Sequence, residues 1–432
     1  MGTFGTYIAL AKIGLGFSLI LFGVYRKWGL WLSILLGAVA TGFLFGMGPT
    51  DVALSLLRTA HEPKFLSIGG IVACILLLSS VQEFTGQGHR LVAGLAQHMR
   101  SPRLRLIFFP ALIGLLPMPG GAVFSCPMVR DMAEGANIPV EKQALINYWF
   151  RHIWEISWPL YPGYILACIL ADIPISLLWR YTWPIVLISL TVGLLYYLRQ
   201  PVEAPDAARA VSTDRPPLGT VLLEGLPILV AILGMPFYYA LFSLADIDFT
   251  AEIYFIFSLL TAVATATVQT RLPLKKIPAL LFSPGVVRMM LVIYTIYSFK
   301  DIVIGAHVID SIAGAAASPL ALLCLFCLLP VVSGLLTGLM AGFVGTSFPL
   351  LMGLLWQMGL VDDRLTWTIF ALIAGNLGQM SSPIHACFIV TAEFFHVSLP
   401  RFWRGAVVPA CMQFALASLY VAFLHFVVQA KL

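Results

Sequence analysis

The chain of 432 residues is 60% hydrophobic and only 10% charged. In soluble domains about a quarter of the residues are charged, so this composition excludes a soluble globule, and its apolar content excludes a disordered chain. The net charge of +5 is expected to reflect basic loops beside a membrane rather than binding to nucleic acid. The apolar runs are continuous and do not alternate at every second residue, which predicts an all-α polytopic membrane protein rather than a β-barrel.

Ten apolar stretches have the length of a membrane span, which is about 20 residues. Two further apolar segments contain Pro and Gly near their centres, in Leu116-Pro-Met-Pro-Gly-Gly121 and in Gly334-Leu-Leu-Thr-Gly338. Backbone groups freed in this way persist at membrane depth only where protein or water satisfies them, so these segments are predicted to be re-entrant hairpins. The predicted spans are 6–25, 28–48, 65–82, 144–172, 183–198, 218–243, 251–270, 280–299, 365–396 and 405–429, and the hairpins are 106–129 and 319–354.

The distribution of Lys and Arg predicts the orientation of the chain. With the N-terminus outside, sixteen Lys and Arg residues fall in inside loops and six in outside loops. Basic loops remain cytoplasmic in multi-pass proteins. We therefore expect a multi-pass protein of a prokaryotic inner membrane, with both termini outside.

A polar segment with four prolines, 199–217, predicts a cytoplasmic linker between two halves, 1–198 and 218–432. Each half then contains three spans, a hairpin, one long broken span and a closing span. Five crossings is an odd number, so the second half is predicted to be inverted relative to the first.

Short matches between the halves support an internal repeat. Within the first hairpin, the segment from Pro110 to Ser125-Cys-Pro127 resembles the segment from Pro330 to Ser347-Phe-Pro349 in the second. Farther on, Glu155-Ile-Ser-Trp-Pro159 matches Gln379-Met-Ser-Ser-Pro383. The offset between the halves drifts only from 220 to 224 residues over this stretch.

Hairpin tips and helix breaks expose helix N-termini, which bind carboxylate or phosphate groups. Small residues beside them allow a ligand to approach the backbone, although Gly and Ser also simply ease helix packing. The sequence predicts a binding site for a small organic anion at these positions. Its predicted residues are Gly120, Gly121, Ser125, Asn147, Arg151, Ser157, Thr346, Ser347, Asn376, Ser381 and Ser382.

Titratable residues inside the long broken spans predict a site for a coupling ion. Arg151 and Glu155 are four residues apart, so one interpretation is that they only neutralise each other along one helix. The functional interpretation is that His152 and Glu155 titrate near neutral pH and relay protons. The predicted coupling-ion residues are His152, Glu155, Gln379 and His385.

Motifs of the common enzymes are missing from the sequence, which contains no H-E-x-x-H, G-x-S-x-G, Walker A or G-x-G-x-x-G motif. Cys324 and Cys327 have the spacing of a redox pair, but on an apolar helix such cysteines usually pack. We therefore expect no enzyme activity, no cofactor and no metal.

The runs Leu116 to Val129 and Ala374 to Val390 resemble the two signature regions of domain-of-unknown-function family 401. This resemblance covers nearly the whole chain. The family is grouped with the ion-transporter superfamily, which also includes gluconate, citrate and C4-dicarboxylate carriers.

The resemblance implies a homodimeric elevator-type carrier, in which a scaffold holds the dimer and a second part moves across the membrane with substrate. It implies a scaffold of 1–82 and 218–299 and a moving part of 106–198 and 319–432. Sodium-coupled dicarboxylate members carry Ser-Asn-Thr at hairpin tips and breaks, whereas this chain has motifs such as Ser381-Ser-Pro383. Proton coupling is therefore favoured over sodium coupling.

The sequence thus predicts a secondary active transporter of a small carboxylate-type organic anion that alternates access by an elevator movement. Its expected partners are the anion, H+ or Na+, membrane lipid and a second copy of the chain. The alternatives are a passive channel, a membrane subunit of a larger carrier and, in another class, an intramembrane enzyme. The enzyme would need His152, Glu155 and His385 to converge on a nucleophile or a metal.

Overall fold

The computed structural model of the chain describes residues 3–99, 101–115, 121–134, 138–199, 216–312 and 318–429. All regular elements among these residues are helices, and none is a β-strand. The predicted all-α class is therefore confirmed. Most of the predicted linker and the central turn of the first predicted hairpin, with Gly120, lie outside the described residues.

Helices follow one another along the chain with short connections. In chain order they are α1 (Thr3–Tyr25), α2 (Leu30–Leu44), α3 (Pro49–His61), α4 (Pro63–Phe84), α5 (Gln87–Gln97), α6 (Pro102–Gly114), α7 (Gly121–Ala133), α8 (Val140–Arg151), α9 (Pro162–Leu170), α10 (Ile175–Tyr197), α12 (Leu218–Glu224), α13 (Leu226–Ser243), α14 (Ala251–Gln269), the 3-10 helix η1 (Leu274–Lys276), α15 (Ile277–Leu281), α16 (Pro284–Gly305), α17 (Val308–Ile312), α18 (Pro319–Thr337), α19 (Met340–Gln357), α20 (Arg364–Met380), α21 (Ala386–Phe394) and α22 (Leu399–Gln429).

Proline and glycine set many of these helix ends. Helices α4, α9, α16 and α18 each begin with a proline. Proline lacks a backbone N–H, which costs nothing there because N–H groups in the first helical turn have no acceptor within the helix. Ser318 caps α18, because its hydroxyl accepts the Ala321 N–H at 3.1 Å. Gly338 ends α18 in the left-handed conformation, with φ of 62°, which a residue with a side chain rarely adopts.

Eight helices in the described part of the chain are long and apolar enough to cross a membrane, or nine if the bent pair 274–281 and 284–305 is one span. The multi-pass prediction is therefore confirmed. Of the ten predicted spans, 28–48 forms only the 15-residue helix α2. The long spans predicted at 144–172 and 365–396 are each divided into two shorter helices, so the breaks predicted within these spans are present.

The two arms of the second predicted hairpin, α18 and α19, are themselves among these eight helices. They have 19 and 18 residues, and they pack against each other on either side of Gly338. Each arm is thus as long as a full span, whereas the arms of the first hairpin, α6 and α7, have 13 residues each. The re-entrant path of the second hairpin stays a prediction.

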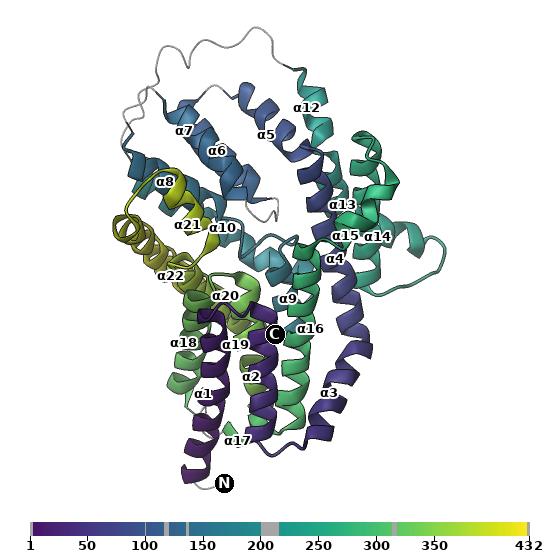
Figure 1. Cartoon of the computed structure of the whole chain (residues 1–432), viewed down its shortest axis with the longest axis vertical. Helices are drawn as coiled ribbons and strands as arrows, with labels where there is room; N and C mark the ends of the chain where they lie inside the picture. Colours follow the sequence, from purple (N-terminus) through teal and green to yellow (C-terminus); the bar gives the residue numbers. More distant parts are fainter. Residues whose placement is uncertain are drawn as a thin grey trace.

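Pairs of packed helices recur in the two halves of the chain. α1 packs on α2 and α13 on α14, and across the halves α2 packs on α16 and α14 on α4. The hairpin arm α7 contacts α21, and its counterpart α19 contacts α9. Figure 1 shows α6 and α7 in the upper part of the molecule and α18 and α19 in its lower part. These helix-to-helix contacts therefore recur in both halves of the chain, as the predicted repeat requires.

Two glycines make the same close contact in both halves. A Cβ atom at Gly114 in α6 would lie 2.2 Å from the carbonyl oxygen of Arg151 in α8. A Cβ atom at Gly334 in α18 would lie 2.3 Å from the carbonyl oxygen of Gly375 in α20. Each hairpin therefore packs backbone to backbone against the helix that leads into the break of its own half.

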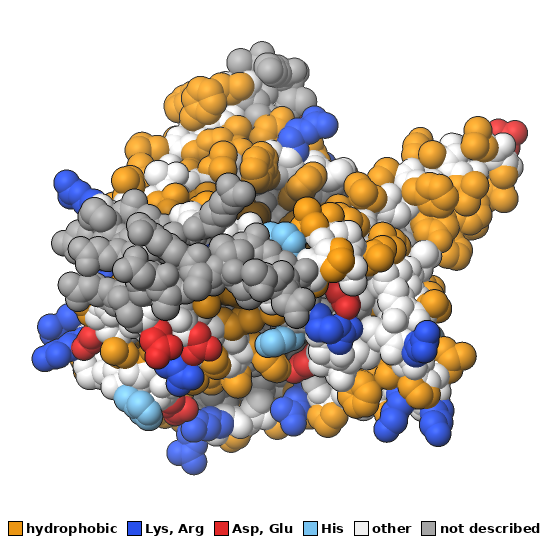
Figure 2. All heavy atoms as spheres, turned by 90° about the horizontal axis from the view of Figure 1, so that it is seen from above, with side chains coloured by type: hydrophobic (Ala, Val, Ile, Leu, Met, Phe, Trp, Pro, Cys, Tyr) orange, Lys and Arg blue, Asp and Glu red, His pale blue; other side chains and the backbone are white. Residues whose placement is uncertain are grey.

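The helices differ strongly in how far they are enclosed by protein. In α19, 83% of the apolar window is buried, whereas in α13 the fraction is 17%. Leu233 and Phe237 of α13 are each 61% exposed, as expected for side chains that face lipid. Figure 2, seen from the upper end of Figure 1, shows hydrophobic side chains over the part that projects to the right and Lys and Arg side chains around the rim.

Candidate functional site

The two broken helices meet through a side-chain hydrogen bond. Gln379 Nε2, from the last turn of α20, donates to Glu155 Oε2, from the break between α8 and α9, at 2.8 Å. Glu155 is 8% exposed and Gln379 is 1% exposed. These residues are separated by 224 positions, which is the offset of the predicted repeat. The structure therefore brings together, inside the protein, two positions that the predicted repeat matches to each other.

Helix α8 ends at Arg151, and residues 152–157 form turns. In this segment the Ser157 N–H donates to the Trp154 carbonyl at 2.9 Å. Arg151 and Glu155 therefore do not lie on one helix, and the prediction that a single helix carries both is wrong. Pro159, which disfavours helical backbone at the residue before it and cannot itself donate a helical hydrogen bond, keeps a helix from resuming directly after these turns.

The guanidinium of Arg151 lies at the beginnings of two helices. Its Nη1 donates to Cys387 Sγ at 2.6 Å, and Cys387 is the second residue of α21. A Cβ atom at Gly121, the first residue of α7, would lie 2.5 Å from Nη2 of the same side chain. Helix N-termini carry partial positive charge, so Arg151 and these two helix ends form one strongly positive region.

Both predicted histidines lie beside Tyr148. The rings of His152 and His385 have centroids 4.8 Å apart. His152 Nδ1 is 2.6 Å from the Tyr148 carbonyl oxygen, and His385 Nδ1 is 3.1 Å from the Tyr148 hydroxyl. This hydroxyl donates to the Met380 carbonyl at 3.1 Å. Tyr148 thus holds one histidine from each helix break in a fixed position.

Two buried amide oxygens of the site have no hydrogen-bond partner among the described residues: Asn147 Oδ1 and Gln379 Oε1. The amide nitrogen of Asn147 is engaged, because it donates to Cys126 Sγ at 3.1 Å and to Thr391 Oγ1 at 3.2 Å. Buried polar atoms in proteins are nearly always satisfied. These two oxygens are therefore acceptors that a bound water, cation or ligand donor can complete.

Several predicted hydroxyl groups lie inside helices rather than at breaks. Ser125 lies in α7 and donates to the Gly121 carbonyl at 3.3 Å. Thr346 and Ser347 lie within α19, where they donate to the carbonyls of residues 342 and 343 at 2.8 and 2.5 Å. The connection between α18 and α19 lies at Gly338, within the Pro- and Gly-containing centre that the sequence predicted for this hairpin, so the hydroxyls of Thr346 and Ser347 are used by their own helix.

At the breaks, the three predicted serines differ in their partners. Ser157 accepts from Thr182 Oγ1 at 3.3 Å, and Ser382 donates to the Leu335 carbonyl at 2.6 Å. Ser381 Oγ has no hydrogen-bond partner in the described part of the chain. Of the three serines at the breaks, Ser381 is therefore the one whose hydroxyl is available to bind a ligand.

Asn376 lies apart from these contacts, in α20. Its Oδ1 accepts from Gln413 Nε2 of α22 at 3.4 Å. The structure therefore gives Asn376 a packing contact between helices of the second half.

Cys387 was not among the predicted site residues, yet it contacts the centre of the cluster. One ring nitrogen each from His152 and His385 and the Cys387 sulfur lie within 4.8 Å of one another. Cys387 stands two residues after His385, which was the signal available in the sequence. The three residues come from both halves of the chain, so their convergence depends on packing that the sequence pattern does not specify.

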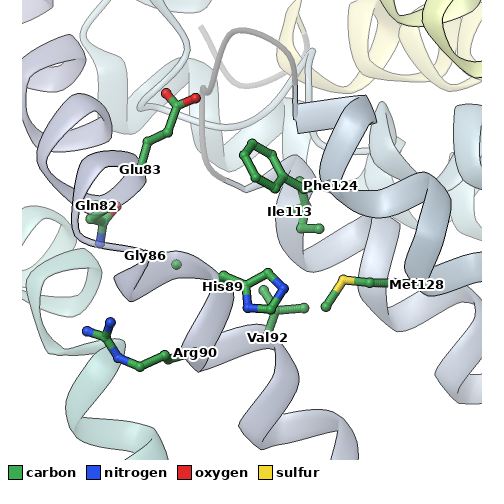
Figure 3. Close-up of a pocket in the computed structure, with 10 residues that line it drawn as sticks. Gln82, Glu83, Gly86, His89, Arg90, Val92, Ile113, Phe124 and Met128 are labelled. Carbon is green, nitrogen blue, oxygen red and sulfur yellow. The ribbon is translucent and has the colours of Figure 1, made fainter.

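A cavity of about 370 Å³ lies between α4 and α5 on one side and α6 and α7 on the other. Figure 3 shows Glu83, His89 and Arg90 on one side of it and Ile113 and Phe124 on the other. The cavity thus lies between the first predicted hairpin and the segment that follows the predicted scaffold of residues 1–82, of which only Gln82 lines it.

Arg90 at this cavity is held by α12. It contacts Glu224 with two nitrogens, at 2.8 and 3.1 Å, and donates to the Thr85 carbonyl at 2.8 Å. Its role in the structure is therefore to tie α5 to α12.

The fold and this cluster define a polytopic α-helical membrane protein with two broken helices that share a buried polar site. The family model described as "Protein of unknown function (DUF401)" matches residues 9–424, and the chain belongs to this family. The family predicted from the sequence is thereby confirmed. Comparison with curated proteins gives no match.

Proposed function

We propose that this protein is a secondary active transporter that carries a small organic anion across the cytoplasmic membrane. The observation that carries the proposal is the hydrogen bond from Gln379 to Glu155, which joins the two helix breaks within a buried polar cluster. Ionisable residues inside a membrane are costly, and they typically mark substrate and ion pathways. Broken helices that meet at mid-membrane are a recurrent way of building such pathways.

The proposed anion site lies where Arg151 faces the N-termini of α7 and α21. A carboxylate there would receive hydrogen bonds from the guanidinium and from free backbone N–H groups, and such charge-assisted bonds are about twice as strong as neutral ones. The hydroxyl of Ser381 supplies a further donor. The positive charge favours an anion over a neutral substrate of the same size.

The proposed coupling ion is H+, with Glu155 as its carrier. A buried carboxylate that accepts one hydrogen bond from Gln379 can be stable in a protonated and in an ionised form, depending on which groups face it. His152 and His385 lie in the same cluster and supply two further proton acceptors. Na+ is less favoured, because the Ser-Asn-Thr pattern of sodium-coupled carriers is missing at the breaks.

The proposed movement is an elevator in which the hairpins and broken helices slide against a scaffold of residues 1–82 and 218–299. The doubled packing pattern fits an inverted repeat, which supplies the two equivalent end states. The cavity between α5 and α7 lies at the boundary that would slide. We further propose a homodimer, with the upper, basic-rimmed end of Figure 1 on the cytoplasmic side.

A second candidate function is an intramembrane enzyme, and one observation favours it. His152 and His385 do converge on a nucleophilic atom, the sulfur of Cys387. A thiol beside histidine and arginine is a known arrangement for covalent catalysis. An enzyme would turn over an added substrate in detergent solution, where transport cannot occur.

Thermal-shift screening followed by uptake into liposomes tests the transporter. Purified protein is screened against carboxylates, sugar acids, phosphonates and amino acids, with and without Na+ and at several pH values, because a ligand of the folded state raises its stability. The stabilising anion is then offered to proteoliposomes with an inward proton gradient. Saturable, gradient-driven accumulation is expected. Unsaturable flux that ignores the gradient would indicate a channel and contradict the proposal.

A further inference from the structure

We propose that His152, His385 and Cys387 form a binding site for a thiophilic transition-metal ion of the Zn2+ class. Two imidazole nitrogens and one sulfur are the ligand types that Zn2+ and its neighbours prefer, whereas Mg2+ and Ca2+ select oxygen ligands. This inference goes beyond transport and rests only on the geometry of the cluster. It also reverses the expectation, drawn from sequence spacing, that no metal binds.

The spacing of the three donor atoms suits one ion. They lie within 4.8 Å of one another. In a tetrahedral zinc site, bonds of about 2.0–2.3 Å place the ligand atoms roughly 3.3–3.7 Å apart. Side-chain movements on the order of 1 Å would therefore close the site around an ion. The backbone of the two breaks does not need to rearrange.

The surroundings of the histidines match those of metal ligands. A ligating histidine almost always donates its other ring N–H to a carbonyl, carboxylate or water, which fixes the ring orientation. His152 Nδ1 has the Tyr148 carbonyl at 2.6 Å, and His385 Nδ1 has the Tyr148 hydroxyl at 3.1 Å. Both rings are thus oriented through Nδ1, as ligating histidines are through their second nitrogen.

Two charged side chains lie beside the proposed metal site, the carboxylate of Glu155 and the guanidinium of Arg151. Glu155 stands in the same break as His152 and supplies a buried carboxylate. Arg151 Nη1 lies 2.6 Å from Cys387 Sγ, so the guanidinium already places a positive charge beside this sulfur. A bound metal ion would take the place of the guanidinium at the sulfur. The metal-bound thiolate needs this compensation, because a thiol must lose its proton to bind zinc.

The three residues of the site are largely enclosed by protein, since His152 is 6% exposed, His385 is 3% exposed and Cys387 is partly buried. The bound ion would link a residue of the first break to two residues of the second. It would therefore hold the two halves together at the point where the proposed transporter has to rearrange.

Cobalt binding tests the site directly. Full-length protein with a tag that contains no histidine is stripped with a chelator and titrated with Co2+ in the presence of Mg2+. We expect one Co2+ per chain and a thiolate-to-cobalt charge-transfer absorption, which Zn2+ abolishes. Cys387→Ser should lose this absorption, and His152→Gln and His385→Gln should each weaken binding at least about tenfold.

A matched control is Cys168→Ser, since Cys168 is a buried thiol in α9 that takes no part in the cluster. This variant should keep the absorption. If the wild-type protein binds no Co2+ under these conditions, or if Cys387→Ser retains the charge-transfer absorption, the metal site is refuted. Transport of an anion is measured separately, so either result leaves the transporter proposal to its own test.

Alkylation of the wild-type protein provides a test that needs no variant. A maleimide is added with and without Zn2+, and the labelled cysteines are identified by mass spectrometry. Zn2+ should slow labelling of Cys387 and leave labelling of Cys324, an exposed thiol in α18, unchanged. Equal rates at Cys387 with and without Zn2+ would overturn the proposal even if the substituted proteins fail to fold.

Discussion

Gln379 Nε2 and Glu155 Oε2 are 2.8 Å apart, although the two residues are separated by 224 positions in the chain. One is an amide and the other a carboxylate, so the two positions that the predicted repeat matches carry different chemistry. A symmetric pair of carboxylates would repel, and a pair of amides would not titrate. In the proposed transporter, this asymmetry makes Glu155 the member of the pair that carries the proton.

Removal of the Glu155 charge is predicted to separate transport from its driving force. Glu155→Gln should retain exchange of anion across proteoliposomes and lose accumulation driven by a pH gradient, because the carrier can no longer release a proton. Both rates are measured with labelled substrate. Glu393→Gln, an exposed residue of α21, is the matched control and should behave like wild type. Unchanged accumulation by Glu155→Gln would assign the coupling to another group.

Substitution of the two interface glycines is predicted to destabilise the protein. In Gly114→Ala and Gly334→Ala the new methyl group would meet a backbone carbonyl oxygen at 2.2 and 2.3 Å, so the helices must separate. Overpacking of this kind costs about 1–3 kcal/mol of the free energy of unfolding. Thermal unfolding in detergent measures the loss.

The control for this pair is Gly285→Ala in α16, where an added Cβ has no neighbour within 4 Å. There the substitution should leave stability unchanged or raise it, since Ala favours helix over Gly by up to about 1 kcal/mol. Equal effects at all three positions would show that the close backbone approach does not limit stability.

A bulky side chain at the second break is predicted to abolish uptake. Ser381→Trp would place an indole where the buried Ser381 hydroxyl, which has no hydrogen-bond partner among the described residues, now lies. Uptake into proteoliposomes should fall to background while the protein remains monodisperse in size-exclusion chromatography. Ser418→Trp in α22, also partly buried, should transport normally. Normal uptake by a folded Ser381→Trp protein would remove the anion from this position.

Arg151 is predicted to determine anion affinity. Arg151→Lys keeps the charge and loses the planar fork, so it should raise the substrate concentration for half-maximal uptake about tenfold, which corresponds to one charge-assisted hydrogen bond. The maximal rate should change less. Arg130→Lys, on the exposed face of α7, is the control. A change in maximal rate alone would indicate a role in movement rather than in binding.

The sequence by itself determined the class of protein and most of its helices. Continuous apolar runs, scarce charge and prolines at predictable positions are local properties, and each acts within one or two helical turns. For the same reason the breaks before Pro159 and Pro383 could be predicted, whereas the family followed from the resemblance of two runs to its signature regions. The offset of the predicted repeat matched Glu155 to Gln379, and the structure joins these two residues by a hydrogen bond.

Only the tertiary structure decided which side chains meet. No role for Tyr148 or Cys387 could be predicted from the sequence, and Arg151 and Glu155 were expected on one helix, which ends between them. Thr346 and Ser347 were expected at a break and lie inside α19. Contacts between residues more than 200 positions apart depend on how helices pack, and helical periodicity in the sequence reports only which face of each helix is apolar.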